Sequence, residues 1–268
     1  SNSLNVAQML DKSSYSISLG NTHQDGIISS TGMDRYNVKV SADTKLTNNW
    51  SSGFTANYIT TSIDKAVTSG NGLLRTVYAA PPSYDLAGIP SHVDGNPYTQ
   101  NSFRGSFDNA YWAMENNKFT EDTNRFFGNV YASYQTDFGT TNHKLNAKYM
   151  VGVDAYTTHY VDSYGYGSNT GGGRGQIENY GWTNATYNSL LTINYDWHIN
   201  EDWGLNAVVG NEIIQSNRKK YYEYGTNYNF PGWNHINNAT TQQTEEETWK
   251  NRTVGFFGNV SASYRNML

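Results

Sequence analysis

The residues that could carry chemistry are scattered along the chain. No two histidines have the HxH or HExxH spacing of a zinc site, so we expect no metal. The six are His23, His92, His143, His159, His198 and His235. The motif G-x-S-x-G does not occur, and GGGRG at 171–175 lacks the Lys-Ser/Thr pair and the helix of a phosphate-binding loop. We therefore predict that the protein is not an enzyme and has neither catalytic residues nor a cofactor.

Aromatic side chains in the irregular segments are better candidates for binding. Flat rings stack on sugar faces or on peptide side chains and lose little entropy in doing so. The alternative is that these rings pack the loops on one another. The candidate substrate contacts are Tyr84, Tyr111, Trp112, Trp182, Tyr228 and Trp233. The acidic run at 245–247 is expected to be a solvated part of a loop.

The elements that position these residues are predicted to be strands. Apolar and polar residues alternate over much of the chain, and period 2 indicates a strand with two different faces. Tyr36, Val38 and Val40, for example, alternate with Asn37 and Lys39. The predicted strands are 3–9, 13–21, 34–46, 50–60, 126–134, 144–155, 190–199, 203–213 and 256–264.

Short turns and long loops are predicted to alternate as the connections along the chain. Short turns fall at 10–14, 48–49, 139–142 and 200–202, and long loops at about 22–33, 63–123, 158–187 and 217–250. Within the longest loop, 72–80 is a candidate short helix that ends before Pro81 and Pro82. A meander with short turns on one side and long loops on the other is typical of an outer-membrane β-barrel.

Aromatic residues crowd the strand ends near the short turns. Trp and Tyr are enriched at membrane interfaces, so these residues are predicted to form a girdle at one interface. They are Trp50, Tyr134, Phe138, Trp197, Trp203 and Tyr264. A soluble sheet also carries Tyr and Trp at such positions, so the girdle alone does not decide between the two classes.

Composition favours a membrane barrel over a soluble β-sandwich. Only 15% of the residues are charged, against roughly 25% in soluble domains, while mean hydropathy is −0.70. Polarity therefore comes from Asn, Ser, Thr, Gly and Tyr, which suit the interior of a barrel that faces lipid outside. The net charge is −5 and no basic patch is present, so we expect no nucleic-acid partner. There is no cysteine, hence no disulfide.

One phrase occurs twice. FFGNVYASY at 126–134 returns as FFGNVSASY at 256–264, and the copies differ only at Tyr131 and Ser261. In both copies the alternation places Phe, Gly, Val, Ala and Tyr on the outward face. Each copy is therefore predicted to be a strand that runs from a long loop down to the periplasmic end, with lipid on one side and water on the other.

Several longer phrases resemble a known family. YSISLGNTHQDGII, GMDRYNVKVSADTKLTNNWSSGFTANY, NRFFGNVYASYQ, LNAKYMVGVDAY and RTVGFFGNVSASYRNML resemble the barrel of the SusC/RagA-like TonB-dependent outer-membrane transporters of the Bacteroidetes. NGLLRTVYAAPP and NAYWAMENN resemble loop phrases of that family. The resemblance runs over nearly the whole chain in the right order.

The resemblance implies a glycan or peptide importer in the cell outer membrane, surrounded by lipid. Its complete barrel has about 22 strands around a plug, is energised through TonB and is covered by a SusD-like surface lipoprotein. This chain shows only about eight or nine strands and neither plug nor TonB box. Residues 1–268 are thus expected to be a segment of one barrel domain. The alternative is a small closed barrel or a soluble β-module that acts in binding or adhesion and transports nothing.

Overall fold

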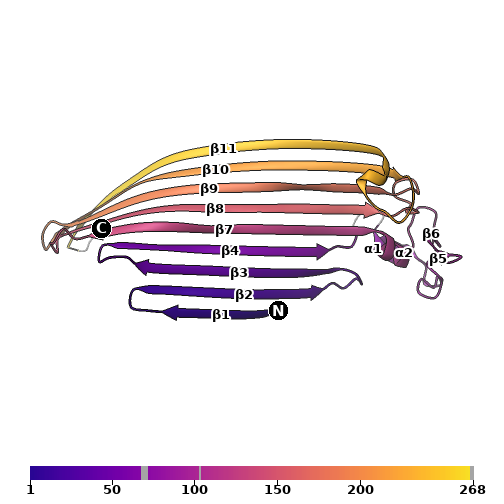
Figure 1. Cartoon of the computed structure of the whole chain (residues 1–268), viewed down its shortest axis with the longest axis horizontal. Helices are drawn as coiled ribbons and strands as arrows, with labels where there is room; N and C mark the ends of the chain where they lie inside the picture. Colours follow the sequence, from indigo (N-terminus) through magenta and orange to yellow (C-terminus); the bar gives the residue numbers. More distant parts are fainter. Residues whose placement is uncertain (68–71, 103, 266–268) are drawn as a thin grey trace.

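The computed structural model describes residues 1–67, 72–102 and 104–265. Nine strands form one sheet in chain order, each antiparallel to its neighbours (Figure 1). The prediction of an all-β antiparallel meander is confirmed. The strands are β1 (Asn2–Met9), β2 (Ser13–Asp25), β3 (Gly32–Lys45), β4 (Trp50–Asp64), β7 (Lys118–Thr136), β8 (His143–Tyr164), β9 (Gln176–His198), β10 (Trp203–Tyr228) and β11 (Ala239–Tyr264).

The second half of the sheet is much taller than the first. Strands β7 to β11 have 19 to 26 residues, whereas β1 to β4 have 8 to 15 (Figure 1). Three loop predictions were wrong in extent. Half of 22–33 is strand, since β2 ends at Asp25 and β3 begins at Gly32. Most of 158–187 and 217–250 is strand, and only 165–175 and 229–238 connect strands there. The acidic run Glu245, Glu246 and Glu247 lies in β11 rather than in a loop.

Each strand places its side chains alternately on two faces of the sheet. Phe54 pairs with Val130, and Val130 pairs with Val151, so residues that were predicted to face outward are neighbours across strands. We call this the apolar face and the opposite one the polar face. The apolar character is confined to the lower band, the part of each strand next to the short turns. In the tall strands it comprises 126–136, 143–155, 187–198, 203–213 and 254–264.

The repeated phrase forms corresponding parts of β7 and β11, both in the lower band. Tyr131 lies on the polar face, where its ring crosses Gly53 of β4 and its hydroxyl donates to Oδ1 of Asp43 in β3 at 2.6 Å. A Cβ on Gly53 would come within 2.8 Å of that ring, so Tyr131 requires a glycine beneath it. Ser261, its counterpart in β11, lies at the edge of the sheet.

The wall formed by these strands has no packed core of its own. The chain exposes 16,513 Å², whereas a compact protein of 30.0 kDa exposes about 11,700 Å². Large apolar side chains of the apolar face are open, including Val130 at 54%, Val209 at 54% and Val260 at 69%. Within the described residues, no strand pairs with the outer edge of β1 or of β11.

The buried side chains gather at the end of the sheet opposite the short turns. We call this region the cap and define it as 65–67, 72–102, 104–117, 165–175 and 229–238. It contains α1 (Leu73–Ala79), β5 (His92–Val93), β6 (Asn96–Gln100), α2 (Ala110–Asn116) and the single turn η1 (Ile236–Asn238) (Figure 1). The helix predicted over 72–80 is confirmed as α1. No helix of the described residues is long and apolar enough to cross a membrane.

Candidate functional site

The cap is organised around the N-terminus of α2. Asn109 precedes the helix, and its side-chain oxygen accepts hydrogen bonds from the amides of Tyr111 at 3.0 Å and Trp112 at 3.2 Å. This is the usual way in which asparagine satisfies the first free amides of a helix. Trp112 is fully buried, and its Nε1 donates to the carbonyl of Pro97 at 2.8 Å. The ring therefore fixes α2 against the β5–β6 hairpin.

A buried carboxylate ties this helix to the 165–175 loop. Asp108 is 2% exposed and accepts from the hydroxyl of Ser168 at 2.6 Å, from the amide of Asn169 at 2.7 Å and from Gln100 Nε2 at 2.8 Å. Hydrogen bonds to an ionised acceptor are stronger than those between neutral groups. Asp108 thus joins segments that lie about sixty residues apart, and it makes the cap one connected unit.

The other side of the cap packs on the upper ends of the strands. Tyr228 at the end of β10 is fully buried with Ile177 and Ala239, and the partly buried Val161 and Ile236 pack against them. Burial raises the pKa of the Tyr228 phenol, because the phenolate would lose its water. This cluster holds the 229–238 loop down on the sheet.

An aromatic groove of about 330 Å³ opens between this loop, α2 and the β5–β6 hairpin. We call it the Trp233 groove. Trp233 is 41% exposed and stacks on Phe230 with ring centres 5.8 Å apart and planes 12° apart. The remaining lining consists of Tyr98, Glu115, Asn116, Gly165, Tyr166, Gly232, Asn234 and His235. An open ring beside amides and a carboxylate is suited to bind a polar ligand with flat, weakly polar faces.

The Trp233 groove is held in shape before any ligand arrives. Asn238 is buried, and its Nδ2 donates to the carbonyls of Phe230 and Trp233, each at 2.8 Å. Gly232 has φ +82°, and a Cβ there would come within 2.5 Å of the Tyr98 hydroxyl. A glycine therefore permits the close approach of Tyr98 to the loop. A rigid site of this kind loses less entropy on binding.

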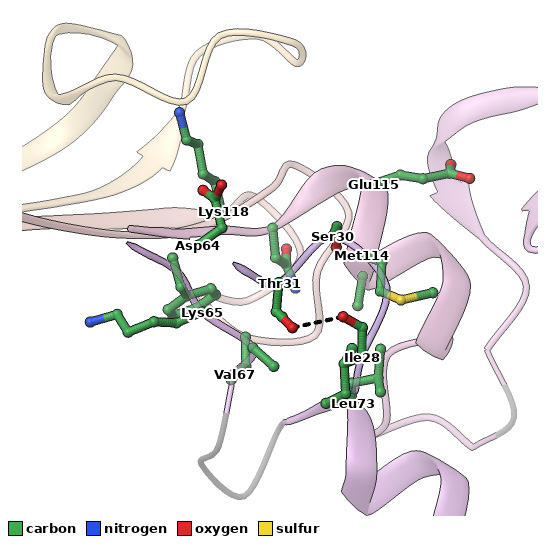
Figure 2. Close-up of a pocket in the computed structure, with 14 residues that line it drawn as sticks. Ile28, Ser30, Thr31, Asp64, Lys65, Val67, Leu73, Met114, Glu115 and Lys118 are labelled. Atoms are coloured by element: carbon green, nitrogen blue, oxygen red, sulfur yellow. Dashed lines mark hydrogen bonds between the residues drawn. The ribbon is translucent and has the colours of Figure 1, made fainter. Parts of the chain in front are cut away.

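A second hollow, the cap cavity, lies between the 26–31 turn, the end of β4, and helices α1 and α2 (Figure 2). Its volume is about 420 Å³. Ile28, Val67, Leu73 and Met114 form an aliphatic lining, while Figure 2 shows the ammonium groups of Lys65 and Lys118 extending away from the hollow. Thr31 Oγ1 donates to the carbonyl of Ile28 at 2.7 Å and so fixes the turn. Such a cavity can bind an aliphatic group, and the charged ends of Lys65 and Lys118 lie outside it.

A ladder of rings crosses the polar face above the lower band. Tyr160 of β8 stacks on Tyr180 of β9 at 4.7 Å and 5°, and Trp182 lies 5.6 Å from Tyr160. Arg218 of β10 lies 5.2 Å from the Trp182 ring. Burial, followed by the nearby carboxylate of Glu178, raises the pKa of Tyr222 to about 12. The ladder stiffens the tall part of the wall through cross-strand pairs.

The six residues that were predicted to contact substrate lie in different surroundings. Trp233 lines the Trp233 groove, and Tyr111 is 43% exposed on α2. Tyr84 lies half-buried in the turn after α1. Trp112 and Tyr228 are fully buried, so they pack the cap, which is the alternative role for these rings. Trp182 was expected in a loop but lies in β9.

Tyr98 and Tyr166 line the groove without having been predicted. Each lies in a turn-rich segment, NPY at 96–98 and SYGYGS at 163–168, where alternation is absent. Tyr98 and Tyr166 come together because Gly167 and Gly232 approach the β5–β6 hairpin closely. A Cβ at either glycine would come within 2.5 Å of an atom of Tyr98. An aromatic residue beside Gly or Pro was the sole available signal.

The six predicted girdle residues all lie at the short-turn end of the sheet. Trp50 contacts Tyr134 with ring centres 5.0 Å apart, and Trp203 contacts Tyr264 at 4.9 Å. Trp197 stacks on His143 at 5.8 Å, and Phe138 is 59% exposed in the turn after β7. The six residues thus lie at one end of the sheet, and their contact with a membrane interface remains a prediction.

No metal-binding arrangement occurs in the part of the chain that the structure describes: no three His, Asp or Glu side chains are grouped so as to hold an ion. Two of the histidines instead contact polar side chains of neighbouring strands. His143 lies 2.7 Å from the Tyr195 hydroxyl, and His23 lies 2.8 Å from Asp34 Oδ1.

Comparison with known proteins identifies the fold. No protein-family model matches the chain, and no curated protein matches it in sequence. Among solved structures, the chain resembles the RagAB peptide importer in its closed-closed state with a TM-score of 0.77 and 15% identity. The RagAB peptide transporter and the open-open state of the importer each give 0.78 and 14% identity. These alignments cover 98% of this chain.

The likeness shows the fold: the nine-stranded antiparallel sheet matches a segment of a β-barrel wall. The chain spans about 30% of the length of the RagAB chains that it matches. At this identity the comparison carries the fold alone.

Proposed function

We propose that the chain forms part of the wall and the outer cap of a SusC/RagA-like importer in the cell outer membrane. The observation that carries this proposal is the continuous apolar face of a nine-stranded sheet whose fold follows RagAB over 98% of its length. The apolar side chains would face lipid, and the girdle residues would lie at the periplasmic interface.

The two edges of the sheet support a larger barrel. A free edge presents unpaired amides and carbonyls, and no membrane sheet can leave these in lipid. The edge of β11 has 26 residues. Pairing of β1 and β11 with further strands of one barrel satisfies both edges. The small closed barrel loses support here, because β1 and β11 do not pair with each other among the described residues.

The imported ligand is proposed to be a peptide that contacts the cap. The cap cavity combines an aliphatic lining with the charged residues Asp64, Lys65, Glu115 and Lys118. This mixture suits aliphatic side chains next to charged main-chain or side-chain groups. Oligosaccharide is the second candidate, and the Trp233 groove favours it, because an exposed ring beside amides is the arrangement that stacks on sugar rings.

Two partners follow from the same proposal. A SusD-like surface lipoprotein would cover the cap, and TonB would act through a plug encoded outside residues 1–268. The open reading frame around this chain tests the proposal directly. A plug upstream and further strands downstream are expected, whereas a purified chain that is monodisperse and folded in plain buffer would refute the membrane wall.

Uptake measurements test which ligand is imported and whether Trp233 contacts it. Trp233→Ala is expected to lower the affinity for the imported oligomer about five-fold, as the loss of one stacked ring costs about 1 kcal/mol. Phe230→Leu is a matched control, because it keeps the loop packed beneath Trp233. Labelled oligopeptides and oligosaccharides of equal length, supplied separately, separate the two candidates by which one accumulates.

A further inference from the structure

A third hollow lies on the apolar face of the wall, far from the cap. It is a groove of about 360 Å³ across β8, β9, β10 and β11. We call it the wall groove. Its apolar lining consists of Tyr149, Val151, Tyr187, Ile213 and Val254, and Arg252 lies at its upper end. Side chains of this lining are open in the chain, with Tyr149 and Tyr187 each 48% exposed.

Arg252 is the first charged residue above the lower band on this face. A strand crosses the hydrocarbon in about ten residues, and Val254 is the tenth residue above Tyr264 at the short-turn end of β11. Arg252 follows on the same face, and Lys250 follows Arg252. Two residues along a strand separate side chains by about 7 Å. The two cations therefore stand at the level where lipid headgroups begin.

The charge of these two residues is not compensated within the described chain. Arg252 Nε donates to the neutral Oε1 of Gln215 at 2.9 Å, which orients the guanidinium without neutralising it. Neither Arg252 nor Lys250 forms an ion pair with a carboxylate of the described residues. The nearest acidic partner on this face, Glu246, already pairs with Lys219 at 2.8 Å. Glu212 in β10 belongs to the polar face, since it alternates with Ile213.

We propose that the wall groove binds an anionic lipid of the membrane, with an acyl chain along the groove and a phosphate on Arg252 and Lys250. The guanidinium of arginine matches phosphate oxygens in pairs, which favours Arg252 as the main anchor. Ser189 Oγ donates to the Tyr149 hydroxyl at 3.0 Å, so this phenol is held in the wall and does not close the groove. The proposal needs the apolar face to meet lipid, but it does not depend on what the barrel transports.

The test is the lipid that accompanies the protein when it is extracted from its membrane in mild detergent. Native mass spectrometry is expected to show bound phosphorylated lipid. Each of Arg252→Gln and Lys250→Gln should lower its retention about five-fold, as expected for one basic residue at a membrane surface. Lys148→Gln is the control, because Lys148 is a cation of the polar face, 4.3 Å from the Tyr131 ring.

A second variant tests the groove without touching charge. Ser189→Trp fills the groove at its lining and should displace the lipid while heat-modifiable migration on a gel shows that the barrel is folded. Inorganic phosphate at millimolar concentration should not compete, because it lacks the acyl chain. Retention that is equal in wild type and Arg252→Gln/Lys250→Gln overturns the proposal, and so does a bound polypeptide or neutral lipid in the groove.

Discussion

The lower band of the wall and the cap put their large side chains in opposite places. In the lower band, Val209 and Val260 are 54% and 69% exposed, and no charged residue interrupts the apolar face. In the cap, Trp112 is fully buried, and so is Tyr228 at the end of β10, against which the cap packs. Polar groups such as Asp108, Asn109 and Asn238 are buried with them.

The difference shows which solvent each region needs. A cap with its own core holds its shape in water, as a small soluble domain does. The lower band reaches a stable arrangement only where its apolar face is covered, since burial of apolar area supplies most of the folding free energy. In the proposed membrane wall, lipid would cover it. The upper parts of β7 to β11 lie between these extremes and rely on cross-strand rings and ion pairs.

The largest effect is expected from the core of the cap. Trp112→Ala removes the side chain that joins α2 to the β5–β6 hairpin and should lower the free energy of unfolding of the cap by about 3–5 kcal/mol. Hydrogen exchange of 72–102 and 104–117 measures it. Tyr111→Ala, at the neighbouring exposed position, is the control. Equal destabilisation by both variants would show that the cap has no core of its own.

The lower band is tested by a charge on its apolar face. Leu191→Arg in β9 should destabilise the folded state in a bilayer by about 2–4 kcal/mol. Thr183→Arg lies on the same face of the same strand but above the lower band, and should cost less than about 1 kcal/mol. Urea titration in lipid vesicles compares the two. Similar costs would abolish the distinction between the bands.

A smaller loss is expected from the buried carboxylate of the cap. Asp108 accepts four hydrogen bonds, three on Oδ1 from Gln100 Nε2 and from the amide and Nδ2 of Asn169, and one on Oδ2 from Ser168 Oγ. Asp108→Asn replaces one of these two acceptor oxygens by an NH₂ group, which then faces a donor in either orientation of the amide. The cost should be about 1.5–3 kcal/mol. Faster hydrogen exchange in 165–175 would report it, while Asp85→Asn in an exposed turn should leave that loop unchanged.

The smallest effect concerns pH in the tall part of the wall. The pKa of Tyr222 is raised to about 12 by burial and then by Glu178, from the ordinary value of 10.0. The folded state therefore holds the proton more tightly than the unfolded state. The stability that Tyr222 contributes is complete below pH 10 and is lost as pH rises toward 12. Absorbance titration should show a lower Tyr222 pKa in Glu178→Gln; an unchanged pKa would assign the shift to burial alone.

The meander could be read from the chain because alternation is a local property. Phe54, Val130 and Val151 each alternate with polar neighbours, so their shared face followed from each strand alone. The outward and inward faces of the repeated phrase were likewise predictable. The upper strands were misread as loops because their two faces are both polar or aromatic. In β10, for instance, Tyr221 and Tyr222 occupy opposite faces, and no period appears.

The sequence identified aromatic residues of the cap as candidates but did not show which are buried and which are exposed. Trp112 and Trp233 have similar surroundings in the sequence, with Asn and Gly or Ala close by, yet one is fully buried and the other is 41% exposed. Their difference depends on contacts with Pro97 and Phe230, of which the first lies fifteen residues away. Tyr98 and Tyr166 were missed for the same reason.

The amino-acid sequence by itself determined the two-faced strands, the short turns, the girdle residues at the strand ends and the helix before Pro81, because each depends on near neighbours along the chain. The tertiary structure alone decided which rings form a core and which line the Trp233 groove. It also decided how far the strands rise and where Arg252 stands above the wall groove. Those properties depend on pairing between residues distant in sequence, and a local pattern does not encode the partner.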